Sequence, residues 1–141
     1  MKIFQVLLPV FLFLATKNPS ATAQTAAQTG ENVWVIVNYI KESNKADYEK
    51  WMTEVFFAPM KTTQDPVLKK QYTATRWLTP ANQNEDKTWT YVFLMDPVVP
   101  NGDYDIENYL VKTYGAEKGK AYMKQFEGFM AKEGQMHVLN R

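Results

Sequence analysis

The chain contains no cysteine and only one histidine, His137, among its 141 residues. The absence of cysteine excludes a disulfide framework, a thiolate metal site and a cysteine nucleophile. Zinc binding through imidazole, or a Ser-His-Asp triad, would depend on His137 alone. The sequence therefore predicts no metal site, and nothing in it indicates a cofactor.

An excess of charge of one sign is also absent, because 16 basic residues are interspersed with 15 acidic ones. Nucleic-acid binding needs a basic patch or stripe, so we expect no nucleic-acid partner. Beyond residue 15, no apolar run reaches the roughly 20 residues of a membrane-spanning helix. We therefore expect the mature chain to have no membrane association.

The amino-terminal 23 residues have the order of a secretory signal peptide. A basic start, Met1-Lys2, precedes an apolar stretch over residues 3–15, and small residues follow up to Ala21-Thr22-Ala23. The apolar stretch is too short to span a bilayer. We expect cleavage after Ala23 and an exported protein, either periplasmic or secreted.

Cleavage there would leave 118 residues with 14 basic and 15 acidic side chains, because Lys2 and Lys17 are removed. Residues 24–31 are small and polar, which predicts a flexible lead-in. Residues 32–141 are enough for one domain with a sizeable core.

Hydrophobic periodicity predicts the order β-α-β-β-α-β within this domain. Residues 33–40, 71–79, 88–95 and 135–140 have strand patterns. Residues 45–60 have the 3- and 4-residue spacing of an amphipathic helix. Two further helical runs are separated by Gly115, and Gly134 is a candidate helix stop. This order predicts an α+β, ferredoxin-like fold, with one antiparallel sheet and helices on one face.

Alternation along the predicted strands divides their side chains into two sets. The aliphatic set, which includes Val33, Val35 and Val37, is expected to pack under the helices. The other set is aromatic with a few polar groups, and an apolar patch of this size is rarely exposed on a soluble monomer. A second copy packed sheet to sheet would cover it. The aromatic set is Trp34, Asn38, Tyr72, Arg76, Trp89, Tyr91, Phe93 and His137.

With this element order and a sheet that is apolar on both faces, the region 32–141 resembles the dimeric α/β-barrel superfamily. That superfamily includes antibiotic-biosynthesis-monooxygenase-like and NIPSNAP-like proteins. The resemblance implies a homodimer in which two sheets form one barrel. The superfamily contains cofactor-free oxygenases, haem-degrading enzymes, isomerases and ligand-binding proteins, so the fold alone does not select an activity.

Three functions remain open. The first is an exported homodimer that binds a small apolar or aromatic ligand in a cavity on the sheet face. Its ligand-binding residues would be Trp34, Asn38, Tyr72, Trp89 and Phe93. The last, after the enzymatic function described next, is a structural dimer whose interior is filled by its own side chains.

The second function is that of a cofactor-independent monooxygenase or isomerase acting on a small aromatic or quinol-like substrate. Its catalytic residues would be His137 as a base, Arg76 as a paired donor to a carboxylate or enolate, and Tyr91 as an orienting phenol. In simpler interpretations, His137 is a hydrogen-bonded interface residue. Arg76 is then paired with an acid at the dimer interface, or stacked on Trp89.

Overall fold

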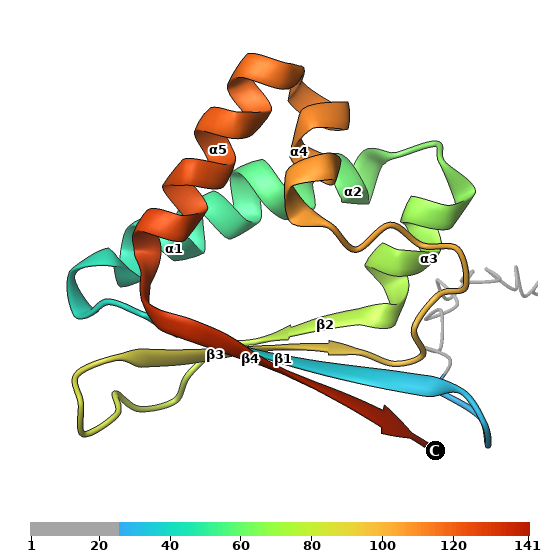
Figure 1. Cartoon of the computed structure of the whole chain (residues 1–141), viewed down its shortest axis with the longest axis horizontal. Coiled ribbons are helices and arrows are strands. Elements are labelled where there is room, and N and C mark those ends of the chain that lie inside the picture. The colour runs from blue at the N-terminus through green and yellow to red at the C-terminus, as the bar shows by residue number, and fades with distance from the viewer. Residues whose placement is uncertain (1–25) are drawn as a thin grey trace, which may run out of the picture.

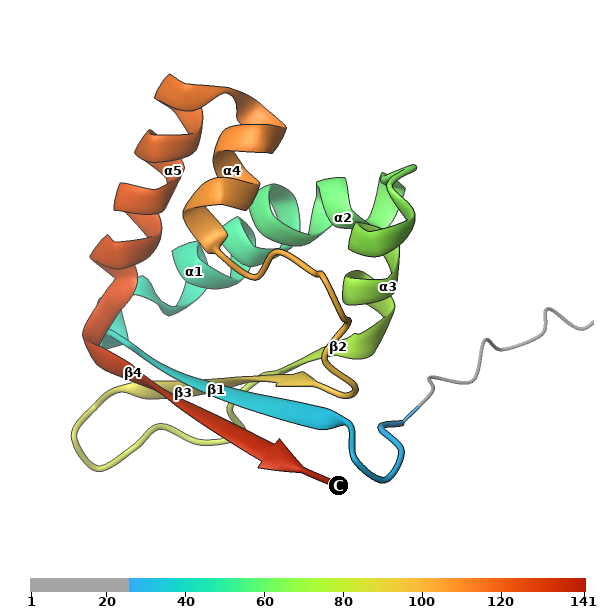
Figure 2. The same ribbon diagram turned by 45° about the vertical axis from the view of Figure 1, so that its right-hand side comes forward.

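The structure is a computed structural model that describes residues 26–141, so the predicted signal peptide lies outside the described residues. Figures 1 and 2 show one sheet with all of the helices on one side of it. Within the described part of the chain, no helix is both long and apolar enough to cross a membrane.

The sheet has four strands: β1 (Asn32–Ile40), β2 (Thr75–Leu78), β3 (Trp89–Met95) and β4 (Met130–Asn140). Their order across the sheet is β2-β3-β1-β4, and each pair of neighbours is antiparallel. The predicted α+β, ferredoxin-like fold with helices on one face of an antiparallel sheet is therefore confirmed.

The helical layer comes from two segments of the chain. The first comprises the short 3-10 helix η1 (Glu42–Asn44), α1 (Lys45–Trp51), the π-helical segment η2 (Met52–Phe57), α2 (Ala58–Thr62) and α3 (Pro66–Ala74). The second comprises α4 (Ile106–Tyr114) and α5 (Ala116–Phe129). Gly115, with φ at 86°, separates α4 from α5 as the sequence predicted.

The strand predicted over residues 71–79 is wrong in its first half, because residues 71–74 belong to α3. The Asp65 carboxylate accepts hydrogen bonds from the backbone N–H groups of Val67 and Leu68, and Pro66 occupies the first turn. A capping carboxylate followed by proline favours the start of a helix. These local signals outweigh the short alternating pattern, and Tyr72 therefore lies on a helix.

The prediction that Gly134 ends a helix is also wrong. Helix α5 ends at Phe129, and Gly134 lies within β4, where the pairing with β1 is irregular. A Cβ atom at Gly134 would lie 2.9 Å from both the Val37 carbonyl oxygen and Asn38 Oδ1. Glycine is needed here for the close approach of β4 to β1, rather than for a helix end.

The π-helical segment η2 precedes Pro59. Proline has no N–H, so Pro59 cannot donate to the carbonyl of Val55 four residues earlier. The Tyr114 hydroxyl of α4 donates to that carbonyl at 2.8 Å. The Tyr109 hydroxyl donates to the Phe56 carbonyl, also at 2.8 Å. Two tyrosines of α4 thus hydrogen-bond the backbone of the irregular segment and fix it against the second helical unit.

Helices α4 and α5 approach each other closely at Gly119, where a Cβ atom would lie 2.6 Å from Val111 Cα. We expect Gly119→Ala to lower the free energy of unfolding by about 1–3 kcal/mol, because the two backbones would have to separate. Gly128→Ala on the same helix is the matched control, since a Cβ there meets nothing within 4 Å. That change is expected to stabilise the protein by about 0.5–1 kcal/mol. Urea unfolding of both variants is the measurement, and equal effects would contradict the close approach.

The side chains of β1 and β3 face the opposite way from the sequence prediction, whereas Arg76 and His137 lie on the face away from the helices, as predicted. The side chains of Tyr91 and Phe93 lie in the core with the helices, and Trp34 packs against that core. Val35 and Leu94, by alternation and register, lie on the open face. Alternation separates two sets of side chains but does not say which set the helices cover. The helices here carry large rings of their own, including Tyr48 and Trp51, and these pack against the aromatic set.

Register defines the rows of side chains on the open face. One row is Leu78, Val92, Val37 and Gln135, and the next is Arg76, Leu94, Val35 and His137. Leu78 of the first row is 48% exposed, and Leu139 on β4 is 50% exposed. The open face is therefore aliphatic at its centre, with polar groups at its edges.

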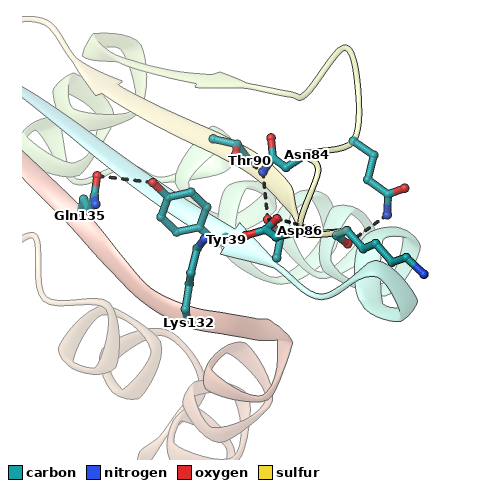
Figure 3. Close-up of polar contacts among 9 residues, drawn as sticks. Tyr39, Asn84, Asp86, Thr90, Lys132 and Gln135 are labelled. Atoms are coloured by element: carbon teal, nitrogen blue, oxygen red, sulfur yellow. Dashed lines mark hydrogen bonds and ion pairs between the residues drawn. The ribbon is translucent and has the colours of Figure 1, made fainter.

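A polar network covers the end of the open face near Tyr39 (Figure 3). Lys132 lies 4.3 Å from the Tyr39 ring centroid and forms a 2.7 Å ion pair with Asp86. Asn84 donates to the hydroxyl of Thr90 on β3 at 2.7 Å. Hydrogen bonds from Lys132 and Thr88 lower the pKa of Asp86 to about 2. The ion pair between Asp86 and Lys132 thus links the loop between β2 and β3 to β4, on the far side of β1.

Candidate ligand-binding cavity

A cavity of about 130 Å³ lies between the sheet and the helices. Its walls come from β1, β2, β3, η2, α2, α3, α4, α5 and the loop between β3 and α4. Most of its lining is apolar, with three methionines and several aromatic rings. The apolar lining residues are Ile36, Met52, Phe56, Met60, Leu68, Phe93, Met95, Tyr104, Ile106, Tyr109 and Phe126.

The sheet contributes two polar residues to the cavity, Thr75 of β2 and the buried Asn38. Asn38 lies on β1 opposite Tyr91 of β3, and only 4% of it is exposed to solvent. The missing side chain at Gly134 leaves room for Asn38 Oδ1 on the β4 side. A buried amide offers both donors and an acceptor, so Asn38 can hydrogen-bond a polar group of a bound molecule.

The hydroxyl of Tyr48 lies near the side chains of Asn38 and Trp77, and neither this hydroxyl nor the Trp77 indole N–H has a hydrogen-bond partner of good geometry. Burial raises the pKa of Tyr48 to about 12, although Asn38 and Trp77 partly oppose the shift. Unsatisfied buried donors are unusual and costly. Neither Tyr48 nor Trp77 lines the cavity, so Asn38 is the buried group of this cluster that a bound molecule can reach.

The loop from residue 96 to residue 105 closes one side of the cavity. The side chain of Gln71 on α3 donates to the Asp103 carbonyl at 2.9 Å. The Tyr104 hydroxyl accepts from the Val99 N–H at 2.9 Å, and its ring packs 5.0 Å from that of Trp34. Burial raises the pKa of Tyr104 above its ordinary value. The loop is therefore held over the cavity by contacts with both α3 and β1.

No lysine, arginine or histidine lines the cavity, and its two acidic lining residues already have partners. Asp103 forms a 2.6 Å ion pair with Lys112. Asp105 caps α4 by accepting from the Asn108 N–H at 2.8 Å. An anionic ligand would find no opposite charge in the cavity and would lose its hydration on entry. The arrangement favours an uncharged, largely apolar molecule.

The predicted catalytic residues do not converge within one protomer. Tyr91 is fully buried on the helix side, where its hydroxyl donates to Glu49 Oε1 at 2.7 Å. Arg76 and His137 lie on the open face, at opposite edges of one row. Three strand spacings separate them, or about 14 Å at 4.7–4.9 Å per strand. No single small substrate within one protomer can contact all three side chains.

Each of these residues has a structural environment of its own. Arg76 pairs with Asp96 at 2.8 Å, which agrees with the simpler interpretation of an arginine paired with an acid. Burial and the adjacent Glu49 raise the pKa of Tyr91 well above its ordinary value. For Glu49, burial alone would raise the pKa, but hydrogen bonds from Lys45 and Tyr91 lower it. Tyr91 therefore remains a protonated donor and is poorly suited to act as a base.

The predicted ligand-binding residues are distributed over four places. Asn38 and Phe93 line the cavity. Trp34 packs against Tyr104, and Trp89 lies beneath the Lys45 ammonium group at 5.2 Å. Tyr72 lies on α3 and faces a different groove.

Sequence analysis missed Gln71, Tyr104 and Tyr109 as cavity residues. Gln71 was hidden by the wrong strand assignment. Tyr104 lies in a loop, where hydrophobic period gives no direction. The period places Tyr109 on the core face of its helix but does not show a cavity there. Among residues 26–141, no cluster of three or more histidine, aspartate or glutamate side chains is placed to hold a metal ion.

These features define a ferredoxin-like α+β domain with an internal, mostly apolar cavity. No family model and no curated protein matches the chain. Among solved structures, the fold is similar to that of a Caulobacter crescentus protein provisionally described as an antibiotic biosynthesis monooxygenase. The two are 14% identical, with a TM-score of 0.44 over 80% of this chain and 91% of that one. The description names one of the groups that the sequence resembles, but a likeness at this level carries no argument about activity.

Proposed function

We propose that this protein is an exported homodimer that binds a small, uncharged and largely apolar molecule in the cavity between its sheet and its helices. The observation that carries the proposal is an apolar cavity with the buried amide of Asn38 in its wall. Small-molecule sites combine an apolar lining with a few polar groups that orient the ligand.

The size of the cavity limits the ligand. A cavity of about 150 Å³ in another protein accommodates benzene, and this one encloses about 130 Å³. The ligand is therefore a single ring or a short chain rather than haem or a flavin. A ring bearing one hydroxyl would place its polar group at Asn38 and its carbon atoms against Met52 and Phe93.

Phenol and toluene test this proposal as a matched pair. Either compound should shift the methyl resonances of Met52, Met60 and Met95, which line the cavity, because aromatic rings displace nearby methyl signals. The methyl group of Met136, which is half exposed on β4 opposite Ile36 and does not line the cavity, is the internal control and should move least. Asn38→Leu should weaken phenol binding about tenfold, the value of one net hydrogen bond, and leave toluene binding unchanged. If neither compound moves the three cavity methyls, the ligand-binding proposal fails.

We further propose that two copies pair through the open face of the sheet. Val35, Val37, Val92 and Leu94 form its aliphatic centre, and Leu78 and Leu139 extend this surface to both edges. A contiguous apolar surface of this kind marks an interaction site, and a closed two-fold arrangement covers it with an identical surface. This dimer uses the aliphatic face, rather than the aromatic face on which the sequence prediction relied. The chain should sediment as a dimer at micromolar concentration.

Export is proposed from the signal-peptide pattern of the first 23 residues. Amino-terminal sequencing of the protein from its source should begin within a few residues of Gln24. A protein that retains Met1 would contradict export by cleavage.

A further inference from the structure

A second hollow lies beside the short edge strand β2, between α2 and α3. This groove has a volume of about 630 Å³, within the range of small-molecule sites. The aromatic floor of the groove consists of Phe57, Tyr72 and Trp77. Lys61, Thr53 and Thr73 lie around this floor. Thr75 is the one residue that lines both the groove and the internal cavity, so the two spaces can be altered separately.

The Phe57 ring contacts both of the other rings of the floor, and all three residues are half-buried. The Phe57 ring centroid lies 5.9 Å from that of Trp77 and 6.1 Å from that of Tyr72. On its core side, Trp77 stacks on Tyr91 at 5.7 Å with an interplanar angle of 13°. Because the core holds Trp77 in place, the floor is already arranged to receive a flat ring.

Lys61 is the one charged residue in the lining of this groove. It is exposed, and it forms no ion pair with the residues that the structure describes. The hydroxyls of Thr53 and Thr73 donate to carbonyls of their own helices, which leaves their oxygens as acceptors only. The charge that complements this lining is therefore a single negative charge near Lys61.

We propose that this groove binds a planar aromatic carboxylate, with its ring on Phe57, Tyr72 and Trp77 and its carboxylate at Lys61. An ammonium group attracts a carboxylate through a charge-assisted hydrogen bond, and aromatic rings supply contact area with little loss of side-chain freedom. The internal cavity lacks a cation and excludes such ligands, so the two sites select molecules of different charge.

Benzoate and its uncharged analogue benzamide are the probes. Titration with benzoate should shift the indole N–H resonance of Trp77, assigned by its loss in Trp77→Phe, and leave the methyl resonances of Met52 and Met60 in place. Lys61→Gln should weaken benzoate binding about tenfold and leave benzamide binding unchanged. Lys70→Gln, an exposed lysine of α3 outside the groove, is the matched control and should change neither.

Tyr72→Ser should weaken both probes, because it removes one ring of the floor. Asn38→Leu should leave benzoate binding intact, so failure of the cavity proposal does not remove this one. The proposal is overturned if benzoate leaves Trp77 unmoved, or if Lys61→Gln and Lys70→Gln have equal effects. It is also overturned if the Trp77 resonance moves with protein concentration alone, since a second copy would then occupy the groove.

Discussion

Phe93→Asp is expected to prevent the protomer from folding. Phe93 is 6% exposed, and its ring lies 6.2 Å from that of Phe56 and 6.3 Å from that of Phe57. A carboxylate at this position would be buried among aromatic rings without a partner, at a cost of about 3–5 kcal/mol or more. That is a large part of the stability of an ordinary domain.

Circular dichroism and urea unfolding measure this effect. Phe93→Leu is the control, because it keeps the position apolar, and it should remain folded with a smaller loss of stability. A folded, cooperative Phe93→Asp protein would show that Phe93 faces away from the core, as the sequence analysis had assumed.

Val92→Asp is expected to have the opposite outcome, although the two residues are adjacent on β3. Val92 lies on the open face between Val37 and Leu78, where a charge remains accessible to water in the protomer. The variant should therefore fold but no longer pair. Burying two like charges near the centre of a symmetric interface would weaken the dimer by several kcal/mol, or more than about a hundredfold in dissociation constant.

Analytical ultracentrifugation at micromolar concentration would measure this change, with Val92→Thr as a control of similar shape. A variant that stays dimeric would place the interface elsewhere on the protein. A wild-type protein that sediments as a monomer would remove the homodimer proposal altogether.

The corrected face assignment changes the chemistry that the protein can support. On the predicted face, Arg76 and His137 would have stood among the aromatic residues and favoured an anionic or reactive ligand. In the structure, Arg76 is paired with Asp96 on the open face, and the internal cavity contains Asn38 without a cation. Uncharged ligands are therefore expected inside, and the anion-binding groove depends on Lys61 instead.

The sequence by itself determined the order of the elements. Strand β1, strand β3 and the break at Gly115 all follow from patterns within about ten residues, because the hydrophobic period and a glycine with positive φ are local properties. The wrong assignment of residues 71–74 was also local, because a short alternating pattern there predicted a strand although the capped helix start at Asp65 lies just before it.

Only the tertiary structure decided which face of the sheet the helices cover. Alternation divides the residues of β3 into one set that includes Phe93 and another that includes Val92. The side on which a connecting helix packs depends on the whole chain. The cavity is decided in the same way, because Asn38, Gln71 and Tyr104 come from a strand, a helix and a loop more than 30 residues apart in sequence. No local pattern records such contacts, since they form only when the helical layer closes over the sheet.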